Sequence, residues 1–328
     1  MPQAHRRRRI TALAALTVLG LFAASACGKD GDSDAPASNT VNGLSYDLSP
    51  AQSGRVHAAK VDALAAQLPA AVRDRGTLVV TGSVGATPPL RFYATDDRTP
   101  IGSDADISYL LADLLGLKVE TRIGDWAQNF VKVDSGEADV FISNVTVTEE
   151  RKEKYDFATY RLDNIALEVP KDATWTYQDR KSLAGKTIGV GTATNQEQLL
   201  VKWNEDNIAA GLPKIDLAYY EKTSDYYLAL SSGRLDGYLG PNPSAQYHAA
   251  SAGQTKVVTT LSGAGDALQA EIGVLTKKDN GLAGPLRAAI QYAIDNGLYK
   301  QVLDRWGLGG EAVPQSRINP PGLPKKKG

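Results

Sequence analysis

Residues 136–160 read GEADVFISNVTVTEERKEKYDFATY and combine a predicted strand, a polar turn and an arginine. Val140–Ile142 form a short apolar run, which predicts a buried strand of a parallel sheet. Asn144 and Thr146 follow at the carboxyl end of this strand, where open α/β sheets bind their ligands. Arg151 comes five residues later, early in a predicted short helix. Hydroxyl and amide donors beside a guanidinium suit the recognition of a carboxylate.

The segments on either side predict an α/β chain with two similar series of elements. A first series of strands and helices is expected at 76–82, 103–115, 117–123 and 126–135, and a shorter series has strands expected at 187–190, 215–220, 237–240 and 255–259. The chain is expected to cross between two lobes near 166–170 and 269–274. Helices predicted at 282–296 and 298–306 would return to the first lobe, which would therefore be discontinuous.

Several ordered motifs resemble the family 3 extracellular solute-binding proteins of ABC transporters, the receptors for polar amino acids. The strongest are GEADV and TVTEER within residues 136–151, and GTLVV, PLRF, GSDAD and GRLD occur elsewhere in the family's order. The similarity covers residues 75–309, most of the chain. It implies a type II periplasmic-binding-protein-like fold, in which two lobes joined by two hinge crossings close on a small ligand and present it to a permease.

The N-terminus has the features of a lipoprotein signal peptide over residues 1–26. Arg6–Arg9 precede an apolar run that is too short for a comfortable membrane span. Small residues then precede Cys27, the only cysteine, in an arrangement that resembles a bacterial lipobox, although Ala24 stands where leucine is usual. We therefore expect lipidation of Cys27, the alternative being ordinary signal-peptidase cleavage nearby.

The expected domain organisation follows from these features. Residues 27–50 are rich in small and polar residues and predict a flexible tether. Residues 51–167 and 272–310 would form the first lobe, 168–271 the second, and 311–328 a flexible tail. A lipid anchor and a tether would hold the receptor at the extracytoplasmic face of the bacterial cell membrane.

Charge and composition narrow the range of partners. The net charge is −1, and it would be −5 without the first 26 residues, which hold four arginines and no acid. This balance argues against a nucleic-acid partner. The three histidines, His5, His57 and His248, are scattered, and we expect no metal, no cofactor and no catalytic residues. The expected partners are a small carboxylate-bearing solute, an ABC permease and its ATPase, and the expected state is a monomer.

The resemblance assigns ligand roles in the first lobe, each with a plainer alternative. Arg151 would clamp the α-carboxylate of an amino acid with help from Thr146, unless it is a surface charge of its helix. Trp126 would stack on the ligand's side chain, or would pack in the core. Asn144 replaces a small residue and would add an amide donor and acceptor, or cap a turn. Thr87 lies in the loop expected to face Trp126.

In the second lobe, the segment GTATN at 191–195 resembles the family's glycine–threonine turn. Thr194 and Asn195 would offer polar groups at a helix N-terminus, which is a common anion site. The same residues also cap helices well. The two roles are compatible.

Two positions depart from the family pattern. Ser83 and Pro241, the latter beside Asn242, stand where aspartates usually bind the ligand's ammonium group. A buried ammonium without a carboxylate is costly. We therefore hypothesise a carboxylate ligand with little or no need for ammonium pairing, and the alternative is an amino acid bound through Ser83, Asn242 and water. Glu271, near the second crossing, is a weaker substitute.

Two other functions remain open from the sequence. One is a dehydratase for cyclic prephenate-like or arogenate-like acids on the same scaffold, which needs a positioned acid or base such as Glu271. The other is a sensory lipoprotein that retains the closing lobes without transport. A permease and ATPase encoded nearby would favour transport.

Overall fold

The computed structural model describes residues 38–325, which lie within one compact unit. The expected signal peptide, Cys27 and the first part of the expected tether lie outside the described residues. None of the helices between residues 38 and 325 is long and apolar enough to cross a membrane.

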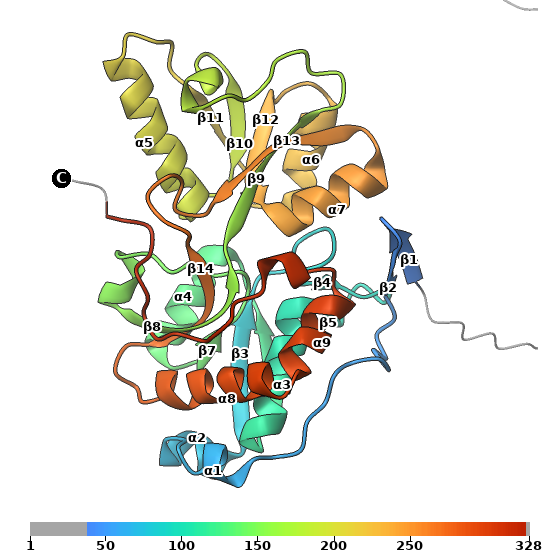
Figure 1. The fold of residues 1–328 in the computed structure, drawn as a ribbon, viewed down its shortest axis with the longest axis vertical. Coiled ribbons are helices and arrows are strands. Elements are labelled where there is room, and N and C mark those ends of the chain that lie inside the picture. Colours follow the sequence, from blue (N-terminus) through green and yellow to red (C-terminus); the bar gives the residue numbers. More distant parts are fainter. Residues whose placement is uncertain (1–37, 326–328) are drawn as a thin grey trace, which may run out of the picture. The chain divides into compact units, whose positions relative to one another are not determined.

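Two five-stranded sheets define the two lobes (Figure 1). The first sheet has the order β6-β3-β7-β14-β8, in which β3 is parallel to β6 and β7, whereas β14 is antiparallel to β7 and β8. Its strands are β3 (Thr77–Gly82), β6 (Lys118–Ile123), β7 (Val140–Phe141), β8 (Tyr155–Leu162) and β14 (Glu271–Lys277). The predicted discontinuity is thus present, because β14 returns to this sheet after the second lobe.

The second sheet has the order β11-β10-β12-β9-β13, with β10 parallel to β11 and β12, and β9 antiparallel to β12 and β13. Its strands are β9 (Asn164–Pro170), β10 (Thr187–Val190), β11 (Asp216–Tyr219), β12 (Gly237–Pro241) and β13 (Thr255–Ser262). The predicted α/β class and two-lobed arrangement are confirmed.

The helices follow the predicted apolar spacing closely. Glycines in the left-handed conformation end α3 and α4 at Gly116 and Gly136, where a side chain would be strained. The first lobe contains α1 (Asp62–Ala65), α2 (Ala70–Arg75), α3 (Ser103–Leu115), α4 (Trp126–Ser135), α8 (Ala283–Asp295) and α9 (Leu298–Arg305), and the second contains α5 (Asn195–Ala209), α6 (Thr223–Ser231) and α7 (Asn242–Ala252).

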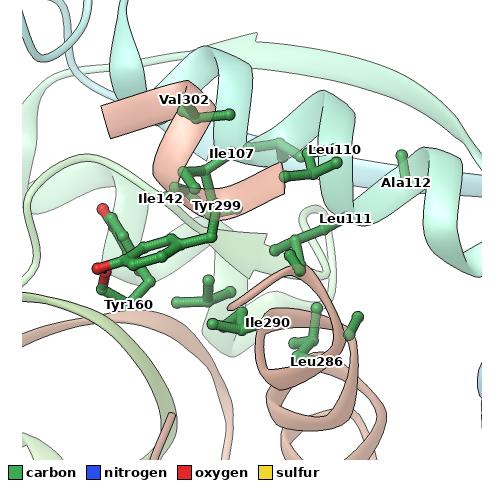
Figure 2. Close-up of a cluster of buried hydrophobic side chains, with 14 of the residues drawn as sticks. Ile107, Leu110, Leu111, Ala112, Ile142, Tyr160, Leu286, Ile290, Tyr299 and Val302 are labelled. Atoms are coloured by element: carbon green, nitrogen blue, oxygen red, sulfur yellow. The ribbon is translucent and has the colours of Figure 1, made fainter. Parts of the chain in front are cut away.

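The returning helices complete the core of the first lobe. Apolar side chains of α3, α8 and α9 meet over the sheet (Figure 2), and Tyr299 Oη donates a hydrogen bond of 2.7 Å to Tyr160 O of β8. The residues that share this cluster include Ile107, Leu110, Leu111, Leu286, Ile290 and Val302. The part of the first lobe before the second lobe and the part that returns after it therefore bury each other's apolar side chains.

The two crossings lie side by side. β8 ends and β9 begins around Asp163, a few residues before the expected position, and the second crossing runs through 263–270 to β14. Asp163 N donates to Ala270 O at 2.8 Å, and Gly263 N donates to Asp163 O at 2.9 Å. These hydrogen bonds tie the crossings together at Asp163.

The structure corrects the expected tether at 27–50 for its described part. β1 (Ser38–Val41) and β2 (Leu44–Asp47) form an antiparallel hairpin. Its buried Tyr46 ring packs edge-on against Tyr247 of α7 at 5.2 Å between ring centroids, and lies 6.0 Å from the Trp306 ring. A few buried side chains such as Tyr46 hold this mostly polar segment against the protein. The average composition of the segment does not indicate this docking.

We predict that Tyr46→Ala lowers the free energy of unfolding by about 2–3 kcal/mol, because it removes a buried aromatic ring. Urea unfolding of the full-length protein in detergent measures the change. Tyr219→Ala, at a half-exposed tyrosine, should change it by less than about 0.5 kcal/mol. Equal stability of the two variants would mean that the hairpin is not docked.

The expected flexible tail at 311–328 is also corrected over its described part. After η3 (Gly309–Glu311), the chain runs back along the first lobe, where Thr159 N donates to Arg317 O at 3.0 Å. Val313 and Leu323 are buried, and Leu323 pairs with the segment after β7 through Glu149 N at 2.9 Å. The proline-rich composition concealed this docking because the segment forms no regular helix or long strand.

Candidate functional site

A cleft of about 810 Å³ lies between the two lobes. The carboxyl ends of β3 and β7 border it from the first lobe, and the ends of β10 and β12 border it from the second. This is the edge where parallel strands place ligand-binding residues. The predicted ligand residues that line the cleft are Ser83, Thr87, Trp126, Asn144, Thr194 and Asn195.

Arg151 and Trp126 converge on one oxygen of the opposite lobe. Trp126 Nε1 donates to Ala193 O at 3.0 Å, and Arg151 Nη2 donates to the same oxygen at 3.1 Å. Arg151 Nη1 also donates to Thr146 O at 2.9 Å. The guanidinium lies over the Trp126 ring at 5.4 Å from its centroid. Two donors of the first lobe thus meet at a single acceptor of the second.

Arg151 is 7% exposed and begins η1 (Arg151–Glu153). Burial lowers the pKa of Arg151 to about 10, so the guanidinium stays cationic at neutral pH. The alternative reading of Arg151 as a surface charge of its helix does not fit this burial. Arg151 is not at the cleft surface itself, because the Ala193 carbonyl covers it.

Ser83 anchors the ends of two strands. Its hydroxyl donates to Gly124 O at 3.1 Å and accepts from Asn129 Nδ2 at 2.9 Å. Its backbone N–H donates to Ser143 Oγ at 3.2 Å. The Ser83 hydroxyl, which replaces the usual aspartate carboxylate, therefore already has hydrogen-bond partners within the protein.

Thr194 and Asn195 open α5 as expected. Thr194 is the N-cap, and its hydroxyl accepts from Glu197 N at 3.1 Å and donates to Gly191 O at 2.7 Å. Asn195 Nδ2 donates to Asp163 Oδ2 at 3.1 Å and to Gly263 O at 2.9 Å. Thr194 thus serves the helix, whereas Asn195 links the cleft to the crossings.

Asn144 adopts a left-handed backbone conformation with φ of 54°, which asparagine tolerates better than most residues. Its side-chain oxygen accepts a hydrogen bond from Arg161 of β8. Arg161 in turn forms a buried ion pair with Glu311. The cleft-lining amide is therefore held by a network that reaches the C-terminal segment.

The structure corrects the expectation for Asn242. β12 ends at Pro241, which lines the cleft, and the helix that begins at Asn242 turns its side chain away. Asn242 Nδ2 donates to Glu311 Oε1 at 3.0 Å, and the residue borders a separate cavity of about 380 Å³. Glu271 also faces away from the cleft, because it forms an ion pair with Arg317.

Thr146 and Asp163 form a buried polar pair that borders Arg151. Asp163 is 0% exposed, and within the described residues neither Asp163 Oδ1 nor Thr146 Oγ1 makes a well-aligned hydrogen bond, although the two side chains are close enough to interact. Burial raises the pKa of Asp163 to about 6, while Thr146, Arg161 and Arg151 act in the opposite direction. No sequence motif singled out Asp163, which directly follows Arg161 and Leu162.

Two further charged residues of the cleft were missed. Arg91 and Asp104 both line it, and Arg91 Nη2 donates to Asp104 O at 3.0 Å and to Ser108 Oγ at 3.1 Å. Burial lowers the pKa of the Arg91 guanidinium. The PLRF and GSDAD motifs contain these residues, but the motifs themselves did not mark them as cleft residues.

Aromatic rings form the wall of the second lobe. Tyr226 and Tyr238 line the cleft and stack with 3.4 Å between ring centroids. Burial raises the pKa of both phenols, which therefore remain neutral. Within residues 38–325, there is no group of three or more histidine, cysteine, aspartate or glutamate side chains that could hold a metal ion.

The two lobes and the intervening cleft define a protein that encloses a small ligand between α/β domains. The sequence model for the bacterial extracellular solute-binding proteins, family 3, matches residues 79–309. The chain therefore belongs to this family, as the motifs indicated.

Named relatives and solved structures agree with this membership. The chain is 31% identical over 238 residues to the L-cystine-binding protein TcyJ of Escherichia coli K12, covering 72% of this chain and 84% of that protein. It is 28% identical over 261 residues to the arginine-binding protein ArgT of Corynebacterium glutamicum, covering 79% and 83%. A solved ancestral arginine-binding protein bound to arginine superposes with a TM-score of 0.61 at 28% identity, covering 71% of this chain and 98% of that one.

Proposed function

We propose that this protein binds an amino acid in the cleft and delivers it to an ABC permease. The observation that carries the proposal is the convergence of Trp126 Nε1 and Arg151 Nη2 on Ala193 O. A carboxylate oxygen is a stronger acceptor than a carbonyl. A ligand carboxylate would therefore replace Ala193 O at these two donors, with Thr146 and the α5 N-terminus close by.

The rest of the cleft suits the side chain of the ligand. It combines the rings of Trp126, Tyr226 and Tyr238 with hydroxyl groups, a mixture typical of small-molecule sites. Its volume of about 810 Å³ leaves room for a long side chain. L-cystine and L-arginine, which the named relatives bind, are the first ligands to test.

Ligand binding would favour the closed arrangement of the lobes. Donors of the first lobe and the Gly191–Asn195 loop of the second lobe would grip the same molecule, so the ligand would bind more tightly when both are in place. A permease could then distinguish loaded from empty receptor. Recognition alone is needed for this role, without any bond being made or broken.

The same proposal includes a lipid anchor, the partners of the receptor and its oligomeric state. The lipobox-like sequence before Cys27 supports a lipid anchor at the extracytoplasmic membrane face. The permease and its ATPase are the inferred partners, and a monomer is the inferred state. Selective labelling of Cys27 with a lipid precursor in cells would test the anchor.

A dehydratase function has less support. One solved structure at 25% identity, with a TM-score of 0.61, is described as an ancestral amino-acid-binding protein and a precursor of cyclohexadienyl dehydratase. That description names binding for the ancestor itself. Glu271, the acid considered for catalysis, is turned toward Arg317.

A ligand screen by thermal unfolding of the full-length protein in detergent tests the proposal. Tryptophan fluorescence reports unfolding, with L-cystine, L-arginine and the other common amino acids as ligands. A true ligand at 100 times its Kd stabilises the folded state by about 2.7 kcal/mol. No stabilisation by any amino acid would contradict the proposal, and a changed ligand recovered from the wells would support an enzyme.

A further inference from the structure

Arg151 and Asp163 are opposite charges that lie near one another without forming an ion pair. Each is buried, at 7% and 0% exposure, and neither has an ion-pair partner within the part of the chain that the structure describes. Within the described residues, the Arg151 guanidinium donates only to the backbone oxygens of Thr146 and Ala193. Asp163 Oδ1 makes no well-aligned hydrogen bond within the described residues, although the Thr146 side chain is close to the carboxyl. Such unpaired buried charges are costly and need a reason.

Neither charge lines the ligand cleft, but each is hydrogen-bonded to a residue at or beside its wall. Asn195 lines the cleft and donates to Asp163 Oδ2 at 3.1 Å. Trp126 also lines it and shares the Ala193 oxygen with Arg151. Thr146 lies beside both charges, and its hydroxyl, which makes no well-aligned hydrogen bond, is close enough to Asp163 to lower the pKa of that carboxyl. A buried carboxylate and a buried guanidinium thus lie behind the same part of the cleft wall, formed by Asn195, Trp126 and the Ala193 carbonyl.

We propose that Asp163 is the acceptor for the ammonium group of the ligand, acting opposite Arg151, which takes the carboxylate. The inference rests on the proposed amino-acid function and names the group that makes the site specific for a zwitterion. It replaces the earlier hypothesis that the ligand needs no ammonium partner.

Glu271, Ser83 and Asp104, the other groups considered for this role, fit it less well. Glu271 is ion-paired with Arg317, and the Ser83 hydroxyl is already engaged with Gly124 and Asn129. Asp104 lines the cleft, but one of its oxygens accepts from Tyr160 Oη at 2.7 Å, and Arg91 is close to it. Asp163 alone of these acids adjoins both Arg151 and Asn195.

The second crossing is shaped to admit the Asp163 carboxylate. A Cβ atom on Gly263 would fall 1.6 Å from Asp163 Oδ2. Glycine is therefore required at this position for the carboxylate to occupy its place. The second crossing at Gly263 therefore packs directly against Asp163 of the first crossing. This contact places the Asp163 carboxylate where the two lobes meet.

The ionisation of Asp163 gives the proposal a second signature. The charged groups that face it are Arg161 of β8, Glu311 of the C-terminal segment and Arg151 of η1. Its pKa in the free protein is about 6, and a bound ammonium would lower that pKa. Amino-acid binding should therefore weaken as the pH falls through about 6, by about tenfold between about pH 7 and about pH 5.

The test compares each amino acid with the same acid lacking its ammonium, by calorimetric titration of the full-length protein in detergent. The pairs are L-arginine with δ-guanidinovalerate, and L-cystine with dithiodipropionate. Asp163→Asn should weaken binding of the amino acid by about 30-fold or more while changing the deaminated partner by less than about threefold. Glu271→Gln, which removes another buried acid near the crossing, should leave both affinities close to those of the wild type.

Several outcomes would overturn the proposal. Asp163→Asn could keep the preference for the amino acid, or could weaken both members of a pair equally, as a purely structural residue would. Loss of the preference in Glu271→Gln would assign the role to that acid. If Asp163→Asn does not fold, the pH titration of the wild type decides, and a flat profile counts against Asp163. Failure of the wild type to bind any amino acid would instead reject the proposed function, and this inference with it.

Discussion

Arg151→Ala is expected to raise the Kd for the amino-acid ligand by about 100-fold or more. The guanidinium is buried, and it donates across the cleft to Ala193 of the second lobe as well as to Thr146. Its removal would leave the ligand carboxylate without its cationic partner, a loss of about 2–5 kcal/mol in comparable buried pairs. Arg151→Lys should fall in between, because an ammonium cannot offer two parallel donors.

Calorimetric titration measures this effect, with Arg234→Ala as the matched control. Arg234 is an exposed arginine of the second lobe whose Nε donates to Ser232 Oγ. Its loss should change the Kd by less than about twofold. A Kd for Arg151→Ala within about threefold of the wild type would mean that another group holds the carboxylate.

Glu311→Gln is expected to lower the free energy of unfolding by about 3–5 kcal/mol, since it leaves Arg161 buried without a counter-charge. Arg161 is 1% exposed and pairs with Glu311, which also accepts from Asn164 and Asn242 of the second lobe. The melting temperature should fall by about 5–10 °C. The effect would show that a segment expected to be a tail fastens the two lobes near the crossings.

The control for this variant is Glu153→Gln. Glu153 pairs with Lys325, but both side chains are about half exposed to solvent. Exposed pairs contribute about 0–1 kcal/mol, so the melting temperature should hardly move. Similar small shifts for both variants would show that the Arg161–Glu311 pair does not stabilise the fold.

Regular elements with strong local signals were predictable. α3 and α4 have the predicted bounds because their apolar spacing is helical and a glycine ends each of them. The strand ends that border the cleft were also predictable, since Val140–Ile142 precede the polar run that contains Asn144. These features depend on neighbouring residues, which a single sequence displays.

Features that depend on distant contacts were not predictable. Tyr46 and Leu323 anchor segments whose composition resembles flexible chain, and only their partners in the fold show that they are buried. Asn242 was misplaced because one residue at the end of β12 decides whether a side chain faces the cleft. Asp163 became a candidate only when its neighbours Arg151 and Asn195 came together in space.

The most direct test of amino-acid recognition between the lobes is a calorimetric titration of the full-length wild type with the amino acid that stabilises it most. We predict binding of one ligand per chain, with recovery of the ligand chemically unchanged. We also predict a Kd at least about tenfold lower than that of the matched acid without its ammonium. Equal affinity for the two would contradict zwitterion recognition, and the absence of binding by any amino acid would contradict the proposed receptor function.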